Sequence, residues 1–171
     1  MSEIGLIYNF TGNGKGKTSA ALGVALRALG WGWNIAFLQF VKGDRETGEK
    51  RFFERYFPEI EFTQLGFGFT RTCYDHVGAA QAGWERAAEL LHSFSGELLI
   101  LDELNVALAQ ELISVDSVVS ALQTKRADLN VVITGRGAPP ELLAICDLVS
   151  ELGEIKHPYK SGVPARKGLD Y

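Results

Sequence analysis

The chain has 171 residues, of which 46% are apolar, enough to bury one sizeable core and to predict a single domain over residues 1–171. Its formal net charge of −4 excludes a generally basic surface, so no nucleic-acid partner is expected. The sequence has no basic leader and no run of eighteen apolar residues, which excludes a membrane-spanning segment and predicts a soluble, cytoplasmic protein.

Short apolar segments alternate with segments of helical period along the chain. Strands are expected at Ile4–Phe10, Asn34–Phe40, Ile60–Gly66, Glu97–Glu103, Asn130–Arg136 and Asp147–Gly153. Helices are expected at Gly16–Leu29, Ala79–Phe94, Val115–Lys125 and Pro139–Ile145. The alternation is typical of βαβ units, so it predicts an α/β fold with a mostly parallel sheet of about six strands flanked by helices.

Three segments do not follow this alternation: Val41–Pro58, Phe67–Gly78 and His157–Tyr171. They are rich in glycine, basic and aromatic residues, and they are expected to be irregular, as substrate-binding loops often are. In the second segment, Phe67 and Phe69 lie among glycines, where an aromatic face would be able to contact a flat ligand.

The stretch Thr11–Thr18, TGNGKGKT, lies between the first strand and the first helix, as a phosphate-binding loop does. Backbone N–H groups would be turned toward phosphate oxygens at Gly12, Gly14 and Gly16. Lys17 supplies a point charge and Thr18 a hydroxyl for Mg²⁺, beside the positive end of a helix. Residue 11 is threonine where the usual pattern has glycine. The loop alone indicates that a triphosphate is bound, but it leaves open which bond of the nucleotide is broken.

Charged side chains follow two later strands at the edge of the sheet where ligands bind. LLILDE ends in Asp102 and Glu103, which can hold Mg²⁺ directly or through water. VVITGRGAP places Arg136 where its guanidinium can neutralise phosphate oxygens. Lys15 and Arg27 are weaker candidates of the same kind.

Five stretches in this order, FTGNGKGKTSAALGVALRALG, FLQFVKG, LLILDEL, VVITGRGAP and IKHPYKSGVPARKGLDY, resemble the ATP:corrinoid adenosyltransferases of bacterial cobalamin biosynthesis and salvage. The resemblance runs from about Gly5 to Tyr171 and implies a RecA-like P-loop NTPase fold, usually as a homodimer. It implies that reduced Co(I) of a corrinoid attacks C5′ of ATP, so that the 5′-deoxyadenosyl group is transferred and triphosphate leaves. It also implies a flavoprotein that reduces the corrinoid.

The residue pattern and the resemblance together assign roles to particular positions. The predicted ATP-binding residues are Gly12, Asn13, Gly14, Lys15, Gly16, Lys17, Thr18, Ser19, Arg27 and Arg136. The predicted catalytic residues are Lys17, Arg136 and Phe69, the last beside the lower face of the corrinoid, and Thr18 with Glu103 would hold Mg²⁺ or Mn²⁺. The chain departs from the family in having Arg71 where tryptophan is usual, and in starting at the first strand without the N-terminal arm of some members.

Two other functions remain compatible with parts of the sequence. The loop and the carboxylates taken alone would also serve a P-loop ATPase or kinase, which would produce ADP. Arg71 in place of tryptophan would also suit a nucleotide- or corrinoid-binding module without catalytic activity.

Overall fold

The centre of the fold is a six-stranded sheet in which every strand pair is parallel. The computed structural model describes residues 4–41, 46–66 and 76–171, so Phe67, Phe69 and Arg71 lie outside the described residues. The strands are β1 Ile7–Thr11, β2 Ile35–Gln39, β3 Glu61–Gln64, β4 Leu98–Asp102, β5 Asn130–Thr134 and β6 Leu148–Glu151. Their order across the sheet is β3-β2-β4-β5-β1-β6.

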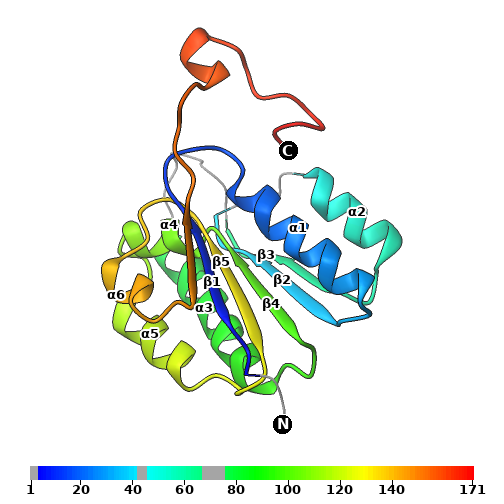
Figure 1. The fold of residues 1–171 in the computed structure, drawn as a ribbon, viewed down its shortest axis with the longest axis vertical. Coiled ribbons are helices and arrows are strands. Elements are labelled where there is room, and N and C mark those ends of the chain that lie inside the picture. The colour runs from blue at the N-terminus through cyan, green and yellow to red at the C-terminus, as the bar shows by residue number, and fades with distance from the viewer. Residues whose placement is uncertain (1–3, 42–45, 67–75) are drawn as a thin grey trace.

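Helices cover both faces of this sheet (Figure 1). On one face lie α1 Lys17–Gly30 and α2 Gly48–Tyr56. On the other face lie α3 His76–Ser93, α4 Leu104–Ala109, α5 Val115–Gln123 and α6 Pro140–Leu143. The sheet is therefore buried on both sides, which explains why its central strands are almost wholly apolar.

Alternating side chains of each central strand build two separate cores. In β2, Ile35 and Phe37 pack with α1 and α2, whereas Ala36 and Leu38 point to the cluster under α3, α4 and α5. The face of α1 against the sheet consists of small residues, Ala21, Ala25 and Ala28. Small side chains let this helix lie close to the strands, so its N-terminus, and the loop before it, are held firmly against the sheet.

Most of the predicted elements are confirmed, with shorter strands than the apolar runs suggest. The expectation that Val41–Pro58 is irregular is wrong over its second half, because α2 forms there behind an N-cap at Thr47, whose hydroxyl accepts a hydrogen bond from the Lys50 N–H at 3.4 Å. The short α4, directly after β4, was also not predicted. The tail is irregular as expected, apart from a 3₁₀ turn at Pro158–Ser161.

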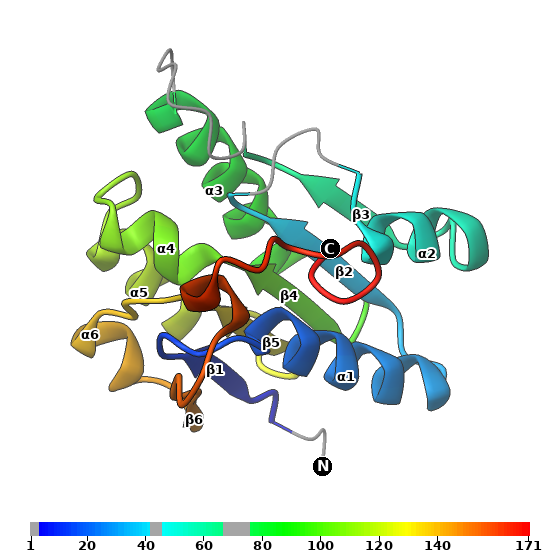
Figure 2. The ribbon, with the colours of Figure 1, turned by 90° about the horizontal axis from the view of Figure 1, so that it is seen from above.

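All six strands deliver their carboxyl ends to the same edge of the sheet, where ligands bind in open α/β folds. Seen from above that edge, the tail after β6 crosses over the loops that follow β1 and β4 and ends over β2 (Figure 2). Among the described helices, none is long and apolar enough to cross a membrane.

Core packing gives a first prediction. Leu91 of α3 is fully buried, so Leu91→Ala should lower the free energy of unfolding by about 2–5 kcal/mol through the lost contacts and the remaining cavity. Leu26→Ala removes the same atoms from a side chain of α1 that is 67% exposed, and it should change stability by less than ~0.5 kcal/mol. Urea unfolding of both variants measures the difference, and equal losses would contradict the assigned packing.

Candidate functional site

The phosphate-binding loop joins β1 to α1 and lies against the end of β6. Gly14 N–H donates to the Leu152 carbonyl at 2.7 Å. A Cβ at Gly14 would stand 2.6 Å from the Gly153 carbonyl oxygen and 2.7 Å from that of Leu152, so this contact excludes any side chain. Gly12 and Gly16 have φ of 92° and 113°, which favours glycine at both positions. The loop is thus shaped by close backbone contact as well as by its turns.

Threonine at position 11 is compatible with this loop, although the usual pattern has glycine there. Thr11 is the last residue of β1 and has no positive φ, so the position does not require glycine. Its carbonyl accepts from Leu152 N–H at 2.9 Å, and its hydroxyl accepts from Ala138 N–H at 3.4 Å. The threonine therefore ties the start of the loop to the two neighbouring connections at the sheet edge.

Lys17 lies over the loop that it follows. Its ammonium donates to the carbonyls of Gly12 at 2.8 Å and Gly14 at 2.7 Å. Burial lowers the pKa of Lys17 below its ordinary value of 10.5, the charge of Arg136 lowers it further, and Glu103 and Asp102 oppose the shift. The charges of Arg136, Glu103 and Asp102 therefore act on Lys17, and an ammonium group with three donors can also bind phosphate oxygens.

Asp102 is the central acceptor of the site and is fully buried at the end of β4. Its Oδ1 accepts from the Thr18 hydroxyl at 2.8 Å and from the Thr134 hydroxyl at 2.7 Å. Glu103, the other predicted carboxylate, is the N-cap of α4 with φ 64°, and its N–H donates to the Thr134 hydroxyl at 2.9 Å. The structure therefore pairs Thr18 with Asp102, whereas the charge of Glu103 acts on Lys17.

Arg136 follows β5 on a turn that buried amides hold in place. Asn9 and Asn105 are both fully buried and bond to each other at 2.9 and 3.2 Å. Asn105 also donates to the Gly135 carbonyl at 3.1 Å, and Gly135 has φ 132°. The turn therefore directs the exposed Arg136 toward the same edge as the loop.

The C-terminal tail reaches the tip of the loop. The Lys15 ammonium forms an ion pair with Asp170, and this hydrogen bond lowers the pKa of that carboxyl, with help from the Arg166 N–H. Tyr171 ends next to Gly48 at the start of α2, since a Cβ on that glycine would lie 3.8 Å from the Tyr171 carbonyl carbon. The tail thus spans the site from β6 to α2 (Figure 2).

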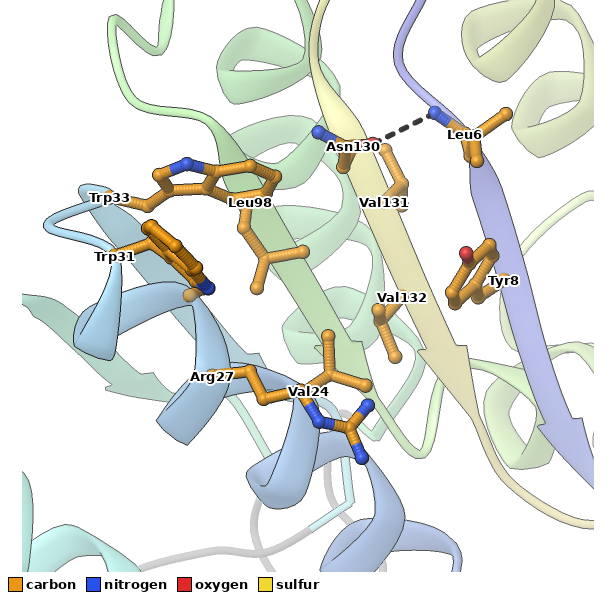
Figure 3. A pocket seen from close by; sticks show the side chains of 11 residues that line it. Leu6, Tyr8, Val24, Arg27, Trp31, Trp33, Leu98, Asn130, Val131 and Val132 are labelled. Atoms are coloured by element: carbon orange, nitrogen blue, oxygen red, sulfur yellow. Dashed lines mark hydrogen bonds between the residues drawn. The ribbon is translucent and has the colours of Figure 1, made fainter.

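Arg27 is the one predicted nucleotide-binding residue of the described chain that lies away from the loop. It is exposed in the last turn of α1, ten residues after Lys17, or about 15 Å along the helix. It borders a pocket of about 250 Å³ between α1 and the strands, with Trp31 and Trp33 on one side and Tyr8 across from them (Figure 3). Asn13 and Ser19, by contrast, are exposed on the loop and on the first turn of α1.

The structure thus brings together most of the predicted residues and adds some that sequence reasoning missed. The sequence did not predict the residues that hold the site residues in place, which are Asn9, Gln39, Asn105, Thr134 and Asp170. A signal for several of them was visible, because a polar residue at the end of an apolar strand must find a partner when it is buried.

Comparison with known proteins shows the family of this chain. The family described as ATP:corrinoid adenosyltransferase BtuR/CobO/CobP matches residues 3–171. A corrinoid adenosyltransferase of Pseudomonas aeruginosa is 40% identical over 172 residues, which cover 99% of this chain and 85% of that protein. Corrinoid adenosyltransferase CobA of Salmonella typhimurium is 38% identical, over 100% of this chain and 88% of that protein. The chain belongs to the ATP:corrinoid adenosyltransferase family.

Solved structures with little sequence identity share the fold. The flagellar accessory protein FlaH of Methanocaldococcus jannaschii superposes with a TM-score of 0.59 at 10% identity, covering 86% of this chain and 71% of FlaH. The KaiC-like protein PH0186 of Pyrococcus horikoshii superposes with a TM-score of 0.54 at 16% identity, covering 90% of this chain and 75% of PH0186. In this chain β5 separates β1, which leads into the loop, from β4, which carries the carboxylates. The predicted RecA-like P-loop NTPase fold is confirmed.

The close contact at Gly14 gives a prediction for nucleotide binding. Gly14→Ala would force the loop away from Leu152 and Gly153, so ATP affinity should fall by about tenfold or more as the N–H groups lose their alignment. Gly23→Ala is the matched control, because a Cβ there meets nothing within 4 Å, and the change should leave ATP affinity intact. Calorimetric titration with ATP tests both, and unchanged affinity of Gly14→Ala would refute the contact.

The lowered pKa of Lys17 predicts how binding depends on pH. A lysine is charged below its pKa, so as pH rises through the lowered value Lys17 loses its proton earlier than an ordinary lysine at 10.5 would. We therefore expect ATP affinity to decline at an alkaline pH that is still below 10.5. Lys17→Met should bind ATP weakly throughout, with a much flatter pH profile, and a wild-type profile equally flat would contradict the assignment.

Proposed function

We propose that this protein transfers the 5′-deoxyadenosyl group of ATP to the Co(I) of a corrinoid and releases triphosphate, in adenosylcobalamin biosynthesis or salvage. The observation that carries this proposal is the family match over residues 3–171, together with an intact phosphate-binding loop. Co(I) of the corrinoid substrate supplies an electron pair to C5′, the C5′–O bond breaks, and its electron pair remains on the triphosphate. The step therefore needs no proton transfer.

The charged groups of the site would act on the leaving triphosphate. The N–H groups of the loop, Lys17 and Arg136 would stabilise the charge that builds up on the oxygen as the C–O bond breaks. The ATP-binding role is proposed for the whole predicted set, including Asn13 and Ser19. The position of Arg27 supports this role less well, because Arg27 lies in the last turn of α1, away from the loop.

A divalent cation, Mg²⁺ or Mn²⁺, would bind beside the phosphates. Thr18, Asp102 and Glu103 offer the hard oxygen ligands that such ions take, with Thr18 and Asp102 already 2.8 Å apart. Within residues 4–41, 46–66 and 76–171, no three His, Cys, Asp or Glu side chains are placed to hold a metal by themselves. That suits Mg²⁺, which usually keeps waters and uses substrate phosphates as further ligands; when bound, it neutralises phosphate charge.

The remaining partners are proposed from the family. Phe69 would lie against the lower face of the corrinoid, with Arg71 in the position of the usual tryptophan. A flavoprotein would supply the electrons that reduce cobalt to Co(I), and the protein would act as a homodimer in the cytoplasm.

One contact is also compatible with a second candidate function. The bond between Thr18 and Asp102, both at the sheet edge, is equally suited to an ATPase or kinase that breaks the bond to the γ-phosphate. Such an enzyme would release ADP, so the phosphate product separates the two functions.

The test is to incubate the protein with ATP, Mg²⁺ and cob(I)alamin under anaerobic reduction. We expect light-sensitive adenosylcobalamin and one triphosphate for each corrinoid, over many turnovers. Lys17→Met should abolish the product, whereas Arg55→Met, which removes an exposed cation at the end of α2, should not. ADP with an unchanged corrinoid spectrum would support the ATPase or kinase, and tight binding without turnover would support a binding module.

A further inference from the structure

Three polar side chains lie in a row across the sheet at its carboxyl edge. The strand register aligns Gln39 of β2 with Gln64 of β3 on one side and with Asp102 of β4 on the other. Neighbours in register point to the same face, so the three side chains can bond in sequence. Gln39 is fully buried, where a polar group without partners would be costly.

The Gln39 amide uses both of its N–H donors on carboxylates. Nε2 donates to Asp102 Oδ2 at 3.0 Å and to Glu49 Oε1 at 3.2 Å, while Oε1 accepts from Gln64 Nε2 at 3.0 Å. One amide thus joins Asp102, the acceptor of the Thr18 hydroxyl, to Glu49 in the first turn of α2. The amide thereby forms a continuous path of hydrogen bonds from α2 to the phosphate site.

This arrangement fixes the orientation of the Asp102 carboxylate. Oδ1 accepts from Thr18 and Thr134, and Oδ2 accepts from Gln39, so rotation of the carboxylate would break bonds on both sides. If the Gln39 amide turned away, buried donors and acceptors would lose partners, which is expensive in a low-dielectric interior. Glu49 therefore helps to hold Gln39, and Gln39 holds Asp102.

We propose that Gln39 is a positioning residue that couples α2 to the Asp102–Thr18 pair, so that affinity for the ATP–Mg²⁺ complex depends on Glu49 through the Gln39 amide. The inference rests on the cation and nucleotide site of the proposed function, and it adds α2 to the elements that control that site. Because coupling is reciprocal, ATP and Mg²⁺ should in turn stabilise the position of α2.

A double-mutant cycle on ATP–Mg²⁺ binding tests the coupling. Glu49→Ala should weaken binding roughly three- to tenfold, and Gln39→Leu by about tenfold or more, because each removes a support of Asp102. If Gln39 transmits the effect, the double variant binds no more weakly than Gln39→Leu alone. Independent effects that multiply in the double variant would overturn the proposal.

Three comparisons separate the hydrogen bond from other causes. Glu49→Gln removes the charge but keeps an acceptor oxygen, so it should bind within about twofold of the wild type. Glu54→Ala removes an exposed carboxylate of the same helix, one that pairs only weakly with Lys50 at 4.0 Å, and it should have no effect. With EDTA present, Gln39→Leu and the wild type should bind ATP alike, because Asp102 acts through the cation.

The opposite outcomes are as informative. A Glu49→Gln variant as weak as Glu49→Ala would mean that charge matters and the bond does not. A loss that persists in EDTA would mean general damage to the loop. Either result would overturn the proposal. Because binding is measured without corrinoid, failure of adenosyl transfer in the wild type would reject the proposed function while leaving this cycle interpretable.

Discussion

A single buried carboxylate joins the parts of this protein that have to act together. Asp102 stands at the end of the central strand β4 and accepts hydrogen bonds from α1 through Thr18, from β5 through Thr134 and from β2 through Gln39. A buried carboxylate without these donors would be strongly unfavourable, so the two strands and the helix are held in one relative position. The phosphate loop begins at the end of β1, beyond β5, and this constraint on α1 and β5 also fixes its position.

The fold could be predicted because its signals are local and repeated. Apolar strands alternating with helical segments are sufficient to indicate a parallel sheet, since strands buried on both faces leave few other arrangements. The two missed helices carry weaker signals. In α2 only Phe53 is buried, in a sequence rich in charge, and α4 is six residues long and starts from Glu103 at positive φ. Both depend on tertiary contacts that a short sequence window does not contain.

The site was predictable where chemistry fixes the residue type, and less so where packing does. Lys17 and Arg136 were found because phosphate requires cations at known offsets from a loop or a strand. The pairing of Thr18 with Asp102 rather than with its neighbour Glu103 depends on which of two adjacent carboxylates points inward, and strand alternation alone did not settle this. Gln39 stands within an apolar run, and that run predicts a strand without giving the glutamine a role, although a buried glutamine must find a hydrogen-bond partner.

The course of the tail also decides where this protein can be joined to something else. Any polypeptide that continues past Tyr171 starts beside Gly48 and above the phosphate loop, whereas β1 begins at the opposite edge of the sheet (Figure 1). A purification tag or fused domain placed after Tyr171 would therefore crowd the space through which a nucleotide enters, and would pull on the segment that brings Asp170 to Lys15. A fusion at the C-terminus therefore lies at the edge of the sheet that holds the phosphate loop, whereas a fusion at the N-terminal side of β1 lies at the opposite edge.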